Sequence, residues 1–147
     1  MKALICMDLT TESLALFKER LPKYNFEQYS EVHLIHGFQT QSYSDNFIYS
    51  TFPTEDQYPE VEKAVIETLR NFQNESPALE NLNVKFACLI SSNPKEAISQ
   101  FAREHEFDQI IIGTRGKHGL EAMFSSSFAE YMVRHAKADL IILRSHK

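Results

Sequence analysis

Short apolar runs alternate along this chain with stretches in which apolar residues recur every three to four positions. Five of the runs are bounded by polar or turn-forming residues, and short runs of this kind are typical of strands. The predicted strands cover residues 3–7, 31–38, 83–90, 108–113 and 138–143.

The stretches between these strands predict helices. The clearest covers residues 59–75, where an apolar stripe recurs at helical spacing and Pro59 lies in the first turn. Ser, Thr and Pro favour the starts of helices, so further helices are expected after Thr10 or Thr11, from Pro94, and from Ser125–Ser127.

The strands are apolar at nearly every position, which indicates a sheet that is covered on both faces. The alternation therefore predicts one α/β domain over residues 1–147, with an open, five-stranded parallel sheet, right-handed crossovers and helices on both faces. In such sheets a ligand binds beyond the carboxyl ends of the strands, where the strand order reverses.

The connection at residues 39–56 is longer than most structureless loops. It carries four aromatic residues, Tyr43, Phe47, Tyr49 and Phe52. Two interpretations are open: a lid or partner surface, and a meander whose aromatic side chains patch the core.

Net charge and the lengths of the apolar runs exclude some classes of binding partner and location. The net charge is −5, which argues against broad electrostatic binding to nucleic acid or to an anionic membrane. No apolar run is long enough for a transmembrane helix, and the first residues lack the features of a signal peptide, so a cytoplasmic location is expected. Cys6 and Cys88 lie in apolar runs and are expected to be buried and reduced.

Three of the four glycines gather between Gly113 and Gly119, after the fourth predicted strand, together with Arg115 and Lys117. Glycine permits left-handed backbone and close approach to a phosphate, and successive N–H groups can form an anion nest. An equally open interpretation is a tight turn, with the following serines only capping a helix. The spacing matches neither a Walker loop nor the first-strand dinucleotide fingerprint.

Asp8 follows the first predicted strand, where a carboxylate can accept from an adenine amino group or a ribose hydroxyl, or can simply start a turn or cap the first helix. His33 and His36 are three positions apart on a strand and so point to opposite faces, which argues against a metal pair. No Gly-x-Ser-x-Gly nucleophile motif is present.

The chain resembles the universal stress protein family over nearly its whole length. The resemblance rests on the first strand ending in Asp8, on HLIHGF, on SSNPKEAI, and on the segment from DQIIIGTRGKHGL to ADLIILR. In ATP-binding members this last segment reads Gly, two residues, Gly, nine residues, then Gly and Ser or Thr. Gly113, Gly116 and Ser127 match that pattern, whereas Ser126 stands in place of the third glycine. A second departure is Ser92, where the family usually has Gly before x-Pro.

The resemblance implies a Rossmann-like fold of the adenine nucleotide alpha hydrolase type, with strand order 3-2-1-4-5. It also implies ATP or a related adenine nucleotide as ligand, with Mg²⁺ as a candidate companion ion. The resemblance implies a nucleotide site that contains Cys6, Asp8, Gly37, Gly113, Gly116, Ser126 and Ser127. The candidate site as a whole adds Ile112, Arg115, Lys117 and Gly119 of the loop region. A homodimer is implied through the last strand, by way of Leu140, Ile141, Ile142 and Leu143, which would cover an apolar sheet edge.

Three functions remain open at this point, of which the preferred one is a nucleotide-binding regulatory module with at most slow ATPase activity. The second is a homodimeric stress or interaction protein with a degenerate phosphate loop, which Ser126 favours. The third is an adenylating or nucleotidyl-transferring enzyme. Such enzymes carry Ser-Gly-Gly or His-x-Gly-His near the first strand, where this chain instead reads Asp-Leu-Thr-Thr-Glu over residues 8–12.

Overall fold

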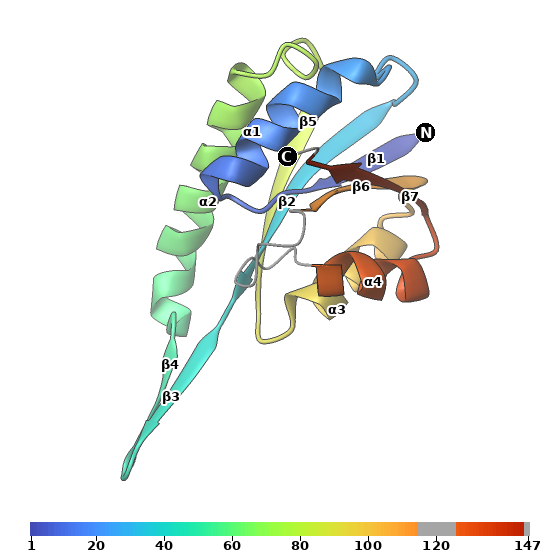
Figure 1. Ribbon diagram of the computed structural model, residues 1–147. Helices are drawn as coiled ribbons and strands as arrows, with labels where there is room; N and C mark the ends of the chain where they lie inside the picture. The colour runs from blue at the N-terminus through green and yellow to red at the C-terminus, as the bar shows by residue number, and fades with distance from the viewer. Residues whose placement is uncertain (115–125, 146–147) are drawn as a thin grey trace.

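A five-stranded parallel sheet forms the centre of the protein. The computed structural model describes residues 1–114 and 126–145. The sheet strands are β1 (Lys2–Cys6), β2 (Glu31–Gln39), β5 (Val84–Ser91), β6 (Gln109–Thr114) and β7 (Asp139–Arg144). Their order is β5-β2-β1-β6-β7, and every neighbouring pair is parallel (Figure 1). Counted among these five strands alone, the order is 3-2-1-4-5, so the predicted fold class is confirmed.

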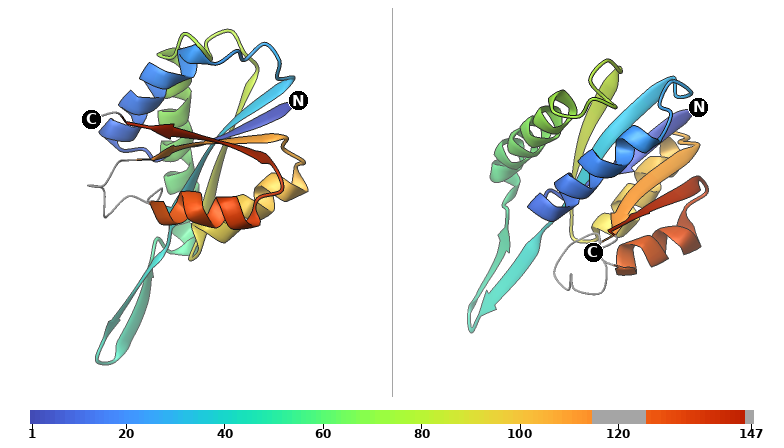
Figure 2. Two further views of the ribbon diagram at one scale, coloured as in Figure 1. Left: turned by 45° about the vertical axis from the view of Figure 1, so that its right-hand side comes forward. Right: turned by 45° about the horizontal axis from the view of Figure 1, so that its top comes forward.

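Helices cover both faces of the sheet. On one face lie α1 (Thr11–Arg20) and α2 (Tyr58–Asn74), and on the other lie α3 (Pro94–Glu104) and α4 (Ser126–His135) (Figures 1 and 2). Two short 3₁₀ turns, η1 (Leu21–Lys23) and η2 (Glu55–Gln57), follow α1 and precede α2. Among residues 1–114 and 126–145, no helix combines the length and apolarity needed to cross a membrane.

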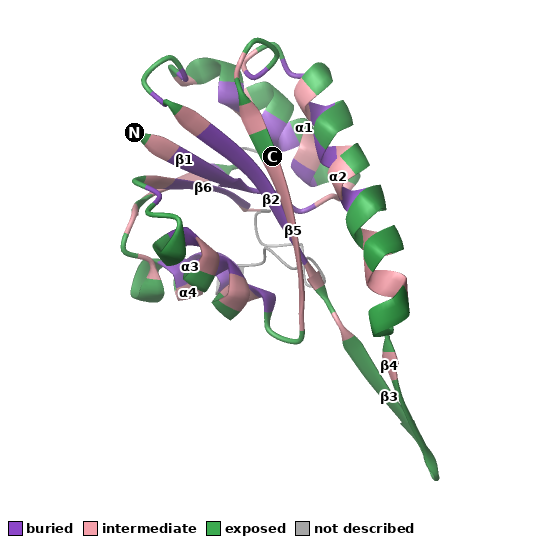
Figure 3. Ribbon diagram, turned by 180° about the vertical axis from the view of Figure 1, so that it is seen from behind, coloured by how far each residue is buried: buried purple, intermediate pink, exposed green. Residues whose placement is uncertain are grey.

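The pleat of the strands divides the core into two clusters. Ala3 and Ile5 of β1 face α1 and α2, whereas Leu4 and Cys6 face α3 and α4. All four are fully buried, because successive side chains of a strand point to opposite faces and both faces are covered (Figure 3). Burial on both faces accounts for the uniformly apolar runs in the sequence.

The first helix starts where a local cap permits it. Thr10 has extended backbone, and its hydroxyl accepts a hydrogen bond from the Ser13 N–H at 3.4 Å. A side chain in this position satisfies one of the N–H groups that the first turn leaves without a partner. Of the two threonines proposed as caps, Thr10 therefore fills the role, and Thr11 is the first helical residue.

Residues 41–52, here called the arm, form an antiparallel hairpin that leaves the body of the protein (Figures 1 and 3). Its strands are β3 (Gln41–Asp45) and β4 (Ile48–Phe52), which pair with each other as a separate two-stranded sheet. Phe47 is 100% exposed, Tyr49 is 73% exposed, and Tyr43 and Phe52 are about half exposed. The interpretation in which these aromatic side chains patch the core is therefore wrong.

Candidate functional site

The reversal of strand order falls at β1. The chain passes from β1 to β2 on one side, and later returns to β6 on the other side of β1. In the register of the sheet, Cys6 lies opposite Ile35 of β2 and opposite Ile112 of β6. The residues that follow these positions, Asp8 and Gly37 among them, are thus brought to the carboxyl edge where open α/β sheets bind ligands.

Asp8 is a buried carboxylate at this edge. Its side chain is 7% exposed, and its Oδ1 accepts a hydrogen bond from the Thr10 N–H at 3.2 Å. This bond confirms the turn-forming role, while the cap of α1 belongs to Thr10 itself. A carboxylate has about four acceptor positions, and the bond to Thr10 uses one of them.

His36 adds a second polar group that the sequence had not marked as part of this site. Its Nδ1 lies 2.7 Å from the carbonyl oxygen of Met7, and because a carbonyl only accepts, Nδ1 carries the proton. Burial lowers the pKa of His36, although the Met7 hydrogen bond and the charge of Asp8 act in the opposite direction. The sequence signal for it was a histidine near the carboxyl end of an otherwise apolar strand.

His33 is separate from this site, as the strand spacing predicted. Its ring lies 4.8 Å from the Phe107 ring, between centroids, on the face that α3 and α4 cover. Its Nε2 lies 2.6 Å from Glu31 Oε1. The described residues include no group of three or more His, Cys, Asp or Glu side chains that could hold a metal ion.

Gly37 and Gly113 are needed for close packing of helices on the sheet. A Cβ atom on Gly37 would lie 2.9 Å from Cβ of Pro94, and one on Gly113 would lie 2.9 Å from Cε2 of Phe17. Neither glycine has a positive φ. The approach of α1 to β6, and not left-handed backbone, is therefore the reason for glycine at position 113.

Cys6 and Ile112 lie beneath this edge with no exposed surface. Burial raises the pKa of the Cys6 thiol far above its ordinary value, so the thiol stays protonated and is a poor nucleophile. Both side chains belong to the cluster that faces α3 and α4. In this structure they shape the sheet under the candidate site and offer no surface of their own to a ligand.

The phosphate-binding part of the predicted site is described at Gly113 and at its last two residues. Arg115, Gly116, Lys117 and Gly119 lie outside the described residues. Ser126 and Ser127 are the first two residues of α4. Because Ser126 belongs to a helix, serine at this position costs no conformational free energy relative to glycine. The first turn of a helix also presents backbone N–H groups that suit an anion.

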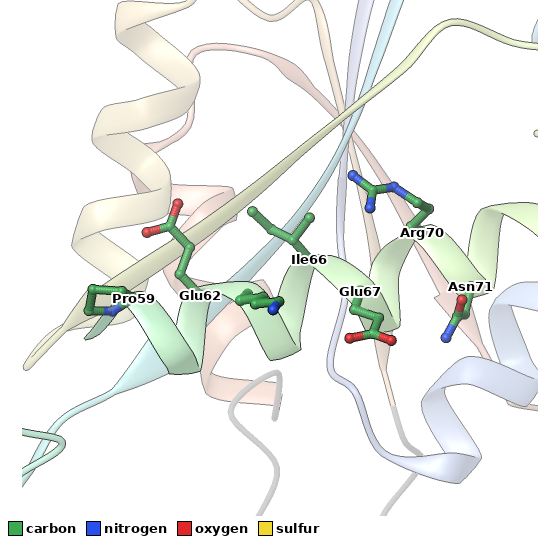
Figure 4. Close-up of a pocket in the computed structure, with 7 residues that line it drawn as sticks. Pro59, Glu62, Ile66, Glu67, Arg70 and Asn71 are labelled. Atoms are coloured by element: carbon green, nitrogen blue, oxygen red, sulfur yellow. The ribbon is translucent and has the colours of Figure 1, made fainter. Parts of the chain in front are cut away.

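A hollow lined by described residues lies away from this edge, along α2. It has a volume of about 770 Å³ and is lined by Pro59, Glu62, Lys63, Ile66, Glu67, Arg70 and Asn71 (Figure 4). The guanidinium carbon of Arg70 is 5.4 Å from the centroid of the Phe86 ring. Two acidic and two basic side chains balance each other along this groove, which therefore gives no net attraction for a phosphate.

The strand order and the helices on both faces define a doubly wound α/β protein, with a candidate ligand site at the carboxyl edge of its sheet. Residues 1–144 match the model of the universal stress protein family, and the chain belongs to that family. A curated relative, universal stress protein MJ0531 of Methanocaldococcus jannaschii, is 30% identical over 59 residues. That match covers 40% of this chain and spans about a third (35%) of the length of the relative.

Solved structures share the fold at low sequence identity. Universal stress protein UspA from Lactobacillus plantarum has a TM-score of 0.68 at 21% identity, covering 98% of this chain and 97% of that one. A universal stress protein in complex with cAMP has a TM-score of 0.62 at 14% identity, with 98% and 96% coverage. The protein from Archaeoglobus fulgidus in complex with dAMP has a TM-score of 0.56 at 14% identity, with 97% of each chain covered.

Proposed function

We propose that this protein is a cytoplasmic regulatory module that binds ATP or a related adenine nucleotide at the carboxyl edge of β1 and β6. The observation that carries the proposal is the buried carboxylate of Asp8 at the point where the strand order reverses. Two family members of the same fold, solved with cAMP and with dAMP, support an adenine nucleotide as the ligand class.

Within this proposal, Asp8 accepts a hydrogen bond from the adenosine part of the ligand. The N-terminal turn of α4, with Ser126 and Ser127, receives the phosphates, together with Gly113, Arg115, Gly116, Lys117 and Gly119. A Mg²⁺ ion that accompanies ATP would be held mainly by the phosphate oxygens, as is usual for this ion. Within this proposal the nucleotide acts through occupancy of the site, and any ATPase activity is slow.

The proposal extends to a homodimer through β7. Leu140, Ile141 and Ile142 are only partly buried, and β7 pairs with β6 along one of its two edges. An apolar strand at the edge of a sheet is an adhesive surface, and pairing with a second copy would cover it.

Nucleotide content and affinity test this function. We expect purified protein to release an adenine nucleotide detectable by mass analysis, and to bind ATP in calorimetry. Asp8→Ala should weaken that affinity about tenfold or more, because a hydrogen bond to a charged group is lost. Asp56→Ala, which removes an exposed acid on η2, is the matched control and should leave the affinity unchanged. Absence of binding to ATP, AMP and cAMP at millimolar concentration would contradict the proposal.

A second candidate is a homodimeric stress or interaction protein that binds no nucleotide. The exposed aromatic side chains of the arm favour it, because large exposed apolar groups in a small region mark interaction surfaces. Ser126→Gly separates the two candidates. A gain in ATP affinity in this variant would show that the rest of the pocket is intact.

A further inference from the structure

The arm has one apolar face and one polar face. In its register, Gln41 pairs with Phe52, Tyr43 with Ser50, and Asp45 with Ile48. These three pairs share one face, because every second pair of residues along a hairpin points to the same side. Tyr43, Ile48 and Phe52 therefore lie together, and the Tyr43 hydroxyl donates to Gln41 Oε1 on the same face. The opposite face carries Tyr49 among Ser42, Ser44 and Thr51.

The charge of the arm narrows the kind of partner. Asp45 is its only charged residue, and the arm contains no Lys or Arg. Nucleic acid and anionic membranes are bound through basic side chains, so neither suits this surface. The exposed Tyr, Ile and Phe side chains of the arm resemble the core of a protein–protein interface, which is apolar and rich in aromatic residues.

We propose that the apolar face of the arm docks on the same face of a second copy of this chain. In this dimer a twofold axis lies midway between the two facing arms and runs perpendicular to their strands. Each strand of one arm therefore lies opposite the same strand of the partner and runs in the opposite direction. Phe52 then faces the partner's Ile48, and Tyr43 faces the partner's Tyr43. The amide nitrogen of Gln41 faces the partner's Asp45, so a donor meets a carboxylate at both ends.

The area of the contact sets the strength expected of this pairing. From the exposed fractions of Tyr43, Ile48 and Phe52, two facing arms remove roughly 600 Å² of side-chain surface from water. This total is about half of the roughly 1,200 Å² that a stable interface buries. Arm pairing is thus a weak, concentration-dependent association of copies, distinct from the pairing of β7.

Sedimentation velocity over a range of protein concentrations, without nucleotide, tests this arrangement. The wild-type chain should show a concentration-dependent larger species. Tyr43→Ser should raise its dissociation constant about tenfold, whereas Tyr49→Ser, the same change on the opposite face, should leave it within about twofold. Both side chains are more than half exposed, and circular dichroism of each variant checks that the fold is kept.

A pair of charge variants tests the register. Gln41→Lys should strengthen the association, because it places a cation opposite the partner's Asp45, and Gln41→Asp should weaken it through like-charge repulsion. An equal response of the two tyrosine variants, or of the two Gln41 variants, would overturn the proposal. So would a single species of constant size at every concentration, the result expected if the arm serves a different protein.

Discussion

At the scale of single residues, Gly113 combines close packing with a proposed ligand contact. The residue lies near the end of β6, at a position that the family pattern marks for phosphate, yet a Cβ added there would first meet atoms of Phe17 on α1. Phe17 is fully buried and meets the Phe72 ring edge-on, with centroids 6.5 Å apart. A side chain at position 113 therefore disturbs the core before it disturbs any ligand.

We expect Gly113→Ala to lower the free energy of unfolding by about 1–3 kcal/mol, the usual cost of overpacking a well-filled core. The added Cβ would lie 2.9 Å and 3.1 Å from two atoms of the Phe17 ring. Urea denaturation measures the loss. The double variant Phe17→Leu/Gly113→Ala should lose less free energy of unfolding than the two single variants lose together. The smaller Leu side chain makes room for the added Cβ. Full wild-type stability of Gly113→Ala would refute this account.

At the scale of elements, the start of α1 depends on one hydroxyl. The Thr10 hydroxyl accepts from the Ser13 N–H and so caps the helix, while the Thr10 N–H donates to the Asp8 carboxylate. Thr10 therefore links the start of α1 to the buried carboxylate at the carboxyl edge of the sheet. The arm is a different kind of element, because its strands satisfy their hydrogen bonds with each other and need little from the core.

Replacing Thr10 with Ala should destabilise the protein by about 1 kcal/mol, as the loss of an N-cap usually does. Thr11→Ala removes the same atoms one residue later, at an exposed helical position, and should change stability by about 0.5 kcal/mol or less. Thermal unfolding of the two variants in parallel checks the difference. Equal stability of the two variants would mean that the cap contributes nothing measurable.

At the scale of the whole molecule, the two buried histidines make stability depend on pH. Burial lowers the pKa of both His33 and His36, one on each face of the sheet. As the pH falls through 6.5, these two histidines bind protons more readily in the unfolded chain than in the folded one. Their contribution to the free energy of unfolding is therefore complete above pH 6.5 and is lost as the pH falls below it. Glu31, whose pKa is lowered to about 2 mainly by hydrogen bonds from Lys85 and His33, loses its contribution only below about pH 4.5.

We expect urea midpoints to fall between pH 7.5 and pH 5.5, and His36→Asn to reduce that fall. Asn retains a donor for the Met7 carbonyl but does not titrate. His135→Asn, at the exposed end of α4, is the control and should keep the wild-type pH dependence. A pH profile that is identical in all three proteins would remove His36 from the explanation.

Much of the whole fold could be read from the sequence, because its signals are local. Five apolar runs and the helical stripes between them follow from the neighbours of each residue along the chain, and they predicted the layers. The family pattern added the strand order. Close approaches could not be predicted in this way, since Gly113 and Phe17 meet only after the sheet has formed. The strands of the arm were missed because β3 carries a single apolar residue, Tyr43, so that no alternation of apolar and polar positions marks it.

The central position of β1 has a consequence for synthesis. This strand is synthesised well before its second neighbour, β6, which begins only at Gln109. At about 5–20 residues per second, roughly 5–20 s pass before the strand can be paired on both sides. During that interval Ala3, Leu4 and Ile5 belong to a nascent chain whose sheet is incomplete. We therefore expect the nascent chain to expose apolar surface, and to be prone to aggregation, until β6 has been made.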